Sequence, residues 1–137
     1  MAKFEKLYED SVLPERKTAT AAGYDFYAHE TAHILPGERT FVKTGVACKL
    51  GDNQYLAVTP RSGIALKKGV TVLNTPGTVD ADYYPGEIGI ILYNTSKIPF
   101  DVAIGDRIAQ GIINEYITVE DDNATGVREG GFGSIGK

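Results

Sequence analysis

Apolar residues recur at a spacing of two along most of this chain, in short runs that end at glycine, proline, asparagine or aspartate. This period is typical of β-strands, because their side chains alternate between the two faces of a sheet. The residues that interrupt the runs are typical of turns. Many short strands predict an all-β fold, a barrel or a jelly roll. We expect strands over residues 4–8, 39–43, 46–50, 54–59, 70–73, 87–93 and 107–116.

Two segments depart from this pattern. Residues 62–68 predict one or two helical turns, because Ser62 is a good N-cap and the residues after Ile64 favour helix. From residue 120 onward the chain becomes polar and then dense in glycine, which predicts a tail that is mobile when nothing binds it. A chain of 137 residues fits one domain. We therefore expect a β-domain over residues 1–119 and a flexible arm over residues 120–137.

Charge and cysteine content narrow the function classes. A net charge of −4 argues against a protein that grips nucleic acid, because it supplies no overall attraction for a polyanion. The single cysteine, Cys48, excludes a disulfide within one chain and favours reduced surroundings, and its strand pattern predicts a buried residue. No apolar stretch approaches the length of a membrane span. We expect a cytoplasmic protein, in the host cytoplasm if the source is a virus.

The glycine-rich end of the chain combines a cation, an aromatic ring and a hydroxyl. Flexible glycines let main-chain N–H groups approach a phosphate, Arg128 and Ser134 add donors, and the ring of Phe132 can stack on a base. A floppy terminus without function is the alternative interpretation of this segment. Both interpretations stay open at this point.

A second candidate is Arg61-Ser62-Gly63, between an expected strand and the expected helix. Exposed N–H groups and the helix dipole at such a position favour anions, so a phosphate site is one interpretation. An ordinary helix cap with a surface arginine is the other.

The third candidate is the segment from Asn74 to Tyr83, a predicted hairpin followed by Asp80 and Asp82. Two carboxylates that close could provide a base toward water or help to organise a metal, although aspartate near a turn is often only a local cap. Asp25 offers a further carboxylate. His29 and His33 lie outside any convincing helical pattern, which argues against zinc and favours a hard cation held by phosphates and carboxylates through water.

In this order, five segments resemble the five motifs of the trimeric dUTPase family, and together they span nearly the whole chain. The segments are Ala22-Gly23-Tyr24-Asp25-Phe26, Pro60-Arg61-Ser62-Gly63, Gly77-Thr78-Val79-Asp80-Ala81-Asp82-Tyr83, Gly105-Asp106-Arg107-Ile108-Ala109-Gln110 and Gly130-Gly131-Phe132-Gly133-Ser134. The resemblance implies a jelly-roll-like β-barrel and a homotrimer with the C-terminal arm exchanged between subunits. It also implies Mg²⁺-assisted hydrolysis of dUTP to dUMP and pyrophosphate.

The resemblance also implies a role for each candidate residue. Asp80 would activate the water that attacks the α-phosphorus, and Asp25 would act on Mg²⁺ through water. Tyr83 would lie beneath the sugar and exclude a 2′-hydroxyl. Uracil would be read by Asn74, Gly77, Thr78, Val79 and Gly89. The phosphates would be held by Ser62, Gly63, Gln110, Arg128, Gly133 and Ser134, Phe132 would stack on the base, and Arg61 would bind substrate or pair with a nearby carboxylate.

Two departures from the family pattern leave questions open. The third motif carries one residue extra before Gly86, so either Tyr83 or Tyr84 lies under the sugar. In the fifth motif Arg128 is one residue closer to Phe132 than usual, and Ile135 replaces a threonine. Two alternatives stand beside the dUTPase interpretation: a dCTP deaminase of the same superfamily, and a dUTP-responsive protein that binds a regulatory partner.

Overall fold

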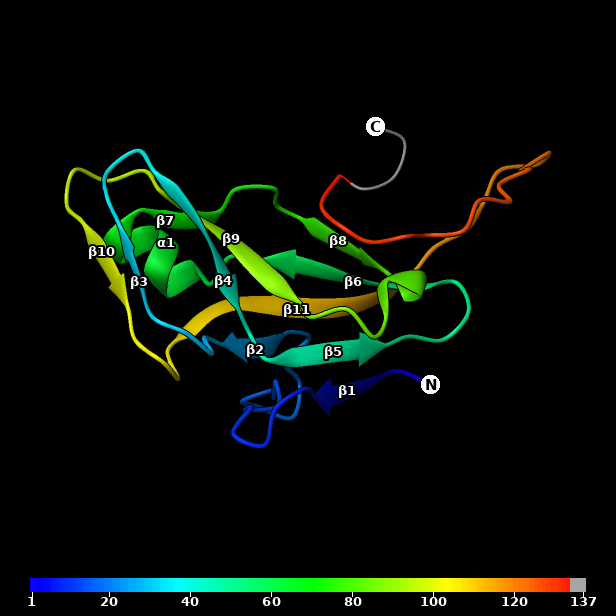
Figure 1. Cartoon of the computed structure of the whole chain (residues 1–137), viewed down its shortest axis with the longest axis horizontal. Helices are drawn as coiled ribbons and strands as arrows, with labels where there is room; N and C mark the ends of the chain where they lie inside the picture. The colour runs from blue at the N-terminus through cyan, green and yellow to red at the C-terminus, as the bar shows by residue number, and fades with distance from the viewer. Residues whose placement is uncertain (134–137) are drawn as a thin grey trace.

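The computed structural model describes residues 1–133, and strands dominate it (Figure 1). All seven predicted strand segments are confirmed as strand over most of their length. Strands β2, β3, β8 and β10, each of three or four residues, were missed. The elements are β1 (Lys3–Lys6), β2 (Tyr24–Tyr27), β3 (Ala32–Ile34), β4 (Arg39–Lys43), β5 (Val46–Lys49), β6 (Gln54–Thr59), α1 (Ser62–Lys68), β7 (Val70–Val72), β8 (Gly77–Asp80), a 3₁₀ turn (Ala81–Tyr83), β9 (Gly89–Asn94), β10 (Phe100–Val102) and β11 (Arg107–Glu115).

The strands pair antiparallel in four sheets. The largest has the order β2-β11-β6-β8, the next has the order β4-β9-β7, and two strand pairs, β1-β5 and β10-β3, complete the fold. Within residues 1–133 these pairings do not close into a continuous barrel. The mostly-β architecture is therefore confirmed, whereas the closed barrel is not formed by one chain.

The core lies between the sheets. Strand β9 shows how the sequence period produces it, since its residues alternate strictly between buried and half-buried positions. Ile90 and Leu92 of this strand belong to one buried cluster with Val42 of the neighbouring strand β4 and with Phe26 of β2, which lies in the largest sheet. Cys48 is buried in the same cluster, as its strand pattern predicted.

The helix α1 forms where it was predicted, but with a different start. Arg61 is the N-cap, its side chain makes no capping hydrogen bond, and Ser62 is the first helical residue. The helix ends at Gly69, whose φ of 66° places it in the left-handed region that glycine adopts without strain. The prediction of Ser62 as the cap was therefore wrong by one position, and the Ser62 side chain is exposed and free for another partner.

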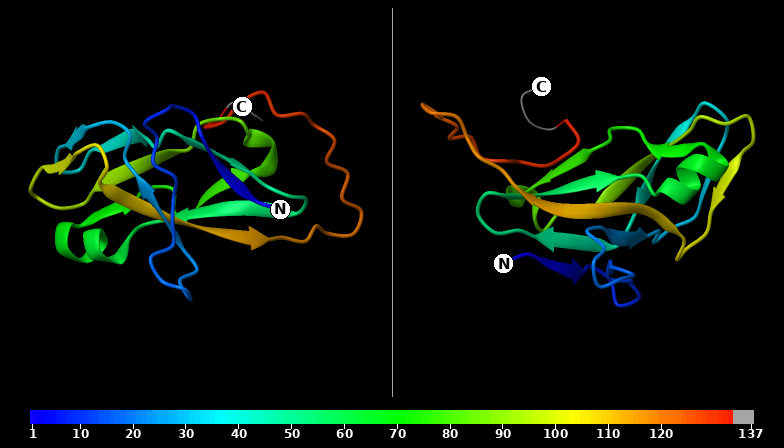
Figure 2. Two further views of the ribbon diagram at one scale, coloured as in Figure 1. Left: turned by 90° about the horizontal axis from the view of Figure 1, so that it is seen from below. Right: turned by 180° about the vertical axis from the view of Figure 1, so that it is seen from behind.

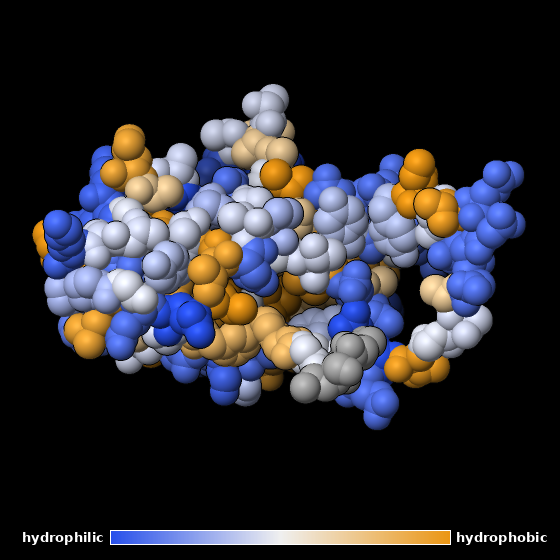
Figure 3. Space-filling model, turned by 90° about the horizontal axis from the view of Figure 1, so that it is seen from above, coloured by the Kyte–Doolittle hydropathy of each residue, from blue (hydrophilic) through white to orange (hydrophobic). Residues whose placement is uncertain are grey.

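The described part of the tail leaves the body of the molecule and returns to it. Between the end of β11 and Gly133 the chain forms no helix or strand. It loops outward beyond the end of β11 and then returns toward β8 (Figures 1 and 2), and the space-filling view shows a loop standing off the body of the molecule (Figure 3). Among residues 1–133 no helix has the length and hydropathy that crossing a bilayer requires.

Candidate functional site

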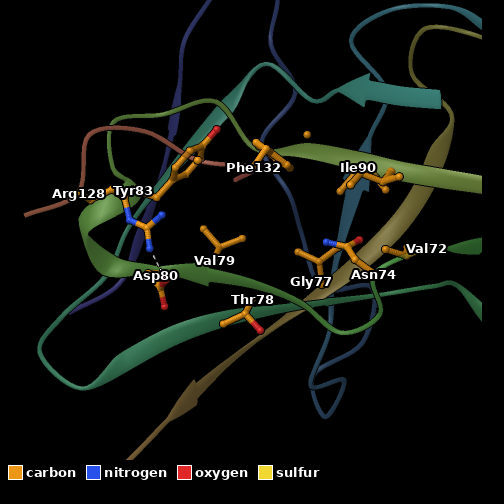
Figure 4. Close-up of a pocket in the computed structure, with 14 residues that line it drawn as sticks. Val72, Asn74, Gly77, Thr78, Val79, Asp80, Tyr83, Ile90, Arg128 and Phe132 are labelled. Atoms are coloured by element: carbon orange, nitrogen blue, oxygen red, sulfur yellow. Dashed lines mark hydrogen bonds and ion pairs between the residues drawn. The ribbon is translucent and has the colours of Figure 1, made fainter. Parts of the chain in front are cut away.

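A cavity of about 200 Å³ opens between β8 and β9, beneath the returning tail (Figure 4). We call it the β8 pocket. It brings together nine of the predicted site residues, which come from three separate segments of the sequence. They are Asn74, Gly77, Thr78, Val79, Asp80, Tyr83, Gly89, Arg128 and Phe132, and the pocket is completed by Val58, Val72, Ile90, Ile91 and Gly131.

The strand that lines this pocket lies at the edge of its sheet. Strand β8 pairs only with β6, so one side of β8 keeps main-chain N–H and C=O groups without a strand partner among the described residues. Val79 points from β8 into the cavity, and Thr78 points to the opposite face (Figure 4). Such an edge can offer donors and acceptors to a flat polar ligand.

The predicted hairpin over residues 74–79 is not formed. Strand β7 pairs with β9, whereas β8 pairs with β6, so this segment crosses from one sheet to the other. The Thr-Pro-Gly turn signal was correct, but a turn signal does not say which strands it joins. The crossing is what opens the pocket between the two sheets.

Tyr83, not Tyr84, faces the pocket. The Tyr83 hydroxyl donates to the main-chain oxygen of Glu87 at 2.6 Å, and the ring occupies space that neighbouring glycines leave free. A Cβ added to Gly86 would lie 2.6 Å from that ring, and one added to Gly131 would lie 2.5 Å from it. The Tyr84 hydroxyl instead donates to Glu5 at 2.6 Å on β1. The structure thus resolves which tyrosine lines the cavity.

Asp80 and Asp82 are bridged by one cation from the tail. Arg128 donates from Nε to Asp82 at 2.6 Å and from Nη2 to Asp80, and its side chain is 19% exposed. These contacts raise the pKa of Arg128, chiefly through the hydrogen bond to Asp82. The guanidinium therefore holds the two carboxylates side by side and neutralises part of their charge.

A second pocket, of about 440 Å³, forms around Asp25, and we call it the arginine pocket. The Asp25 carboxylate lies 3.6 Å from Nε of Arg61 and 3.3 Å from Nη1 of Arg107. Asp25 faces Gln110 across the β2-β11 ladder, and Gln110 donates to the carbonyl of Pro60 at 3.2 Å. Three of the predicted motifs, in the first, second and fourth places along the chain, thus meet here. A surplus of cations suits this pocket to an anion.

The remaining predicted residues lie near these pockets or beyond the described chain. Gly63 lines a neighbouring hollow of about 590 Å³, together with Arg61, Lys67, Lys68 and Arg107. Ser62, at the start of α1, is exposed beside it. Gly133 is exposed, with a φ of 97°, and lies just beyond Phe132. Ser134 and Ile135 fall outside the described residues.

The β8 pocket and the arginine pocket are separate on one chain. They share no lining residue. Asp80 lies opposite Tyr55 on β6, and Gln110 lies opposite Thr59 on the same strand. Four residues of strand separate these positions, which is about 13 Å at the usual rise. The expected site is therefore present as two halves that one chain does not bring together.

The described residues offer no ready cage for a metal ion. Among residues 1–133 no group of three or more histidine, cysteine or acidic side chains converges on one point. Asp25 is already paired with two guanidinium groups, so it suits contact with a hydrated ion through water better than direct ligation. This arrangement suits a metal ion that is bound mainly by the phosphates of a ligand. One carboxylate, that of Asp25, would then contact the water molecules around the ion.

Sequence reasoning missed two residues beside the pocket. Phe41 of β4 lies against Gly89, and its ring centroid is 4.9 Å from that of Phe132. Glu87 accepts the Tyr83 hydroxyl bond through its main chain and takes the N–H of Gly45 on its carboxylate at 2.8 Å. Neither belongs to a motif, and only the pairing of β4 with β9 brings Phe41 near the tail.

Known proteins match this chain over nearly its full length. A family model described as dUTPase matches residues 9–136. A deoxyuridine 5′-triphosphate nucleotidohydrolase of Wolinella succinogenes is 47% identical and aligns with 96% of this chain and 91% of its own. A protein of the same name from Clostridium tetani is 44% identical and aligns with 98% of this chain and 96% of its own.

Solved structures show the same fold. The dUTPase of Streptococcus mutans superposes with a TM-score of 0.79 at 32% identity, over 85% of this chain and 98% of its own. A mutant dUTPase from phage phi11 of S. aureus superposes with a TM-score of 0.80 at 27% identity, over 90% of this chain and 96% of its own. That phage structure is described as showing the coordination of a structural Mg(II) ion.

Proposed function

This chain belongs to the dUTPase family and hydrolyses dUTP, and we propose that a water molecule activated by Asp80 attacks the α-phosphorus. The new bond joins the water oxygen to the α-phosphorus, and the bond from that phosphorus to the bridging oxygen breaks. The water proton passes to Asp80, and pyrophosphate leaves from dUMP. The observation that carries this proposal is the position of Asp80 at the end of β8, on the rim of a pocket of nucleobase size.

Uracil fits the edge of β8. The base presents acceptors and a donor in one plane, which the unpartnered main-chain groups of an edge strand can match. Asn74, Gly77, Thr78, Val79 and Gly89 line this part of the pocket.

The sugar would lie on Tyr83. The ring is fixed by the hydrogen bond to Glu87 and by its contacts with Gly86 and Gly131, so it forms a rigid wall. A rigid wall excludes a 2′-hydroxyl by space alone. We therefore propose Tyr83 as the residue that distinguishes dUTP from UTP.

The arginine pocket and the start of α1 would bind the triphosphate. Ser62, Gly63 and Gln110 would donate to phosphate oxygens, while Arg61 and Arg107 add positive charge around them. Mg²⁺ bound with the nucleotide would offset phosphate charge in the transition state, and Asp25 would orient its water ligands. Arg128 would leave Asp80 for the γ-phosphate, with Gly133 and Ser134 as further donors, and Asp80 would then be free to accept a proton.

We propose that the protein is a homotrimer in which the two halves of each site come from different copies. The separation of the β8 pocket from the arginine pocket supports this proposal, because the two pockets share no lining residue and flank different positions of β6 on one chain. A body over residues 1–119 and an arm over residues 120–137 would then act together, with the arm closing over the shared site and Phe132 stacking on uracil. Residues 128–133 contact their own chain here, and exchange of the arm between subunits stays a prediction.

A regulatory partner also stays a prediction. Structures of the dUTPase of Staphylococcus phage 80alpha, one of which is 28% identical to this chain, are described in terms of control over the transfer of virulence genes. That description belongs to the phage protein. Nothing in the described residues of this chain favours one partner over another.

The test is a comparison of substrates in the presence of Mg²⁺. Pyrophosphate release would be measured with dUTP, dTTP, dCTP and UTP, and ammonia release would be measured with dCTP. We expect dUTP to be preferred by orders of magnitude, and Asp80→Asn to lose about 10²- to 10⁴-fold in kcat while it still binds the nucleotide. Full activity of Asp80→Asn would refute the role of this carboxylate, and ammonia release from dCTP would revive the deaminase alternative.

A further inference from the structure

We propose that Phe41 is a positioning residue that seats the Phe132 ring over the bound uracil. This inference rests on the proposed function and adds to it a residue on a strand that carries none of the motifs. Phe41 lies on β4, opposite Ile91 of β9, and is 41% exposed although it is a large apolar side chain. A half-exposed aromatic ring beside a ligand pocket can bury more of its surface by packing against another aromatic ring.

The Phe41 ring covers a glycine at the pocket wall. A Cβ added to Gly89 would lie only 1.9 Å from the Phe41 ring, so the ring fills the space that any other residue at position 89 would need. Gly89 lines the β8 pocket. The absence of a side chain at Gly89 therefore lets Phe41 reach the mouth of the pocket from the neighbouring strand.

Phe132 packs edge to face against Phe41. The ring centroids are 4.9 Å apart and the planes are at 88°, a favoured geometry for an aromatic pair. Tyr83 flanks Phe132 in the same way, at 6.1 Å and 84°. The tail ring thus lies between two aromatic residues of the body, one from β4 and one from the turn after β8.

The tail has few other attachments to the body. Among the described residues 117–133, the side chain of Arg128 makes the hydrogen bonds that reach the body of the chain. Phe132 itself has a φ of 53°, which is unfavourable for a residue with a side chain and has to be offset by contacts. When Arg128 moves to the γ-phosphate, the aromatic contacts are what holds Phe132 in register with the base. Phe41 therefore determines where the tail docks, whichever chain supplies the tail.

The test is a double-mutant cycle between Phe41 and Phe132. Phe41→Leu keeps an apolar residue on β4 and removes the ring, Phe41→Tyr keeps the ring, and Phe132→Ala removes the partner. We expect Phe41→Leu to raise KM for dUTP by roughly 2- to 10-fold with kcat nearly unchanged, and Phe41→Tyr to resemble the wild type. In the Phe132→Ala background Phe41→Leu should have no further effect on KM. Leu35→Ala, at an exposed apolar residue outside both pockets, is the matched control and should leave KM unchanged.

A second readout follows the tail directly. At a concentration of a non-hydrolysable dUTP analogue near the wild-type KM, trypsin cleavage after Arg128 should be slowed in the wild type and in Phe41→Tyr and slowed less in Phe41→Leu. Independent effects of the two substitutions on KM, or equal protection of Phe41→Leu and the wild type, would overturn the proposal. Failure of the proposed function would look different, because then the wild type itself would show no preference for dUTP and Asp80→Asn would retain its rate.

Discussion

The Tyr83 hydroxyl donates a hydrogen bond to the main-chain oxygen of Glu87 at 2.6 Å, which fixes the ring across the floor of the β8 pocket. Burial, together with the nearby Glu87 carboxylate, raises the pKa of Tyr83. The hydroxyl therefore stays protonated at neutral and moderately alkaline pH and keeps its role as a donor. A ring held from its far end cannot swing away to admit a larger sugar.

Replacement of Tyr83 should weaken the discrimination between dUTP and UTP. We expect Tyr83→Ala to reduce the ratio of the two kcat/KM values by about 10- to 200-fold, the range for contacts that depend on shape. Tyr84→Ala is the matched control, since Tyr84 points to Glu5 on β1 and away from the pocket. Equal losses of discrimination in the two variants, measured by pyrophosphate release, would contradict the assignment of Tyr83.

Arg128 should be sensitive even to conservative change. Its planar guanidinium bridges Asp80 and Asp82, and the same geometry suits a phosphate, whereas lysine offers only a point charge. We expect Arg128→Ala to raise KM for dUTP by roughly 10- to 100-fold and Arg128→Lys to recover only part of that loss. Steady-state kinetics would check this, with Arg39→Ala on the exposed face of β4 as the control. A fully active Arg128→Lys variant would show that charge alone suffices.

Asn94 should matter for stability and not for chemistry. Its fully buried amide donates to the carbonyls of Ile34 and Ile98, at 2.9 and 2.8 Å, and accepts from the main chain and hydroxyl of Ser96. Asn94→Ala would leave those groups without partners, at a cost of about 3 kcal/mol in the free energy of unfolding. Urea denaturation would measure it, and Asn114→Ala should cost less than about 1 kcal/mol because only one hydrogen bond is lost. A loss below 1 kcal/mol in Asn94→Ala would refute this view of the network.

Cys48 should be chemically inert in the folded protein. Burial raises the pKa of its thiol to about 11, so the thiolate that reacts with thiol reagents is about 100-fold rarer than in an ordinary cysteine. A raised pKa also means that folding favours the protonated thiol. This contribution to stability is complete below pH 9 and is lost as the pH rises toward 11. Labelling with a disulfide reagent at pH 8 should be slow for the native protein and fast in urea. Rapid labelling of the native protein would contradict the burial.

The sequence was sufficient to predict the strands that have a clear apolar period and to identify which residues belong to each motif. Strand β9 was predictable because its alternation extends over six residues. The choice of Tyr83 over Tyr84 was not, because it depends on which side of a short turn each ring takes. Phe41 could not be found either, since its place beside Gly89 follows from a pairing between strands that lie far apart in the sequence.

The family resemblance implies a site built from more than one subunit, but no local pattern in the sequence shows which motifs lie apart on one chain. Motifs in order along a chain suggest one site, yet the register of β6 sets Asp80 and Gln110 apart. The apparent hairpin over residues 74–79 failed for a related reason, because β7 and β8 join different sheets. In both cases the positions depend on pairing between strands that lie far apart in the sequence, and local residue types do not specify that pairing.

A mixed-subunit experiment tests most directly the claim that two copies build each site. Asp80→Asn inactivates the β8 half, and the double variant Ser62→Ala with Gln110→Ala inactivates the phosphate half. Each should be nearly inactive alone. When the two are co-expressed with different tags and purified as mixed trimers, about one third of the sites should combine two intact halves and recover dUTP hydrolysis. Mixed trimers that stay as inactive as either parent would show that both halves act within one chain, and would contradict the account.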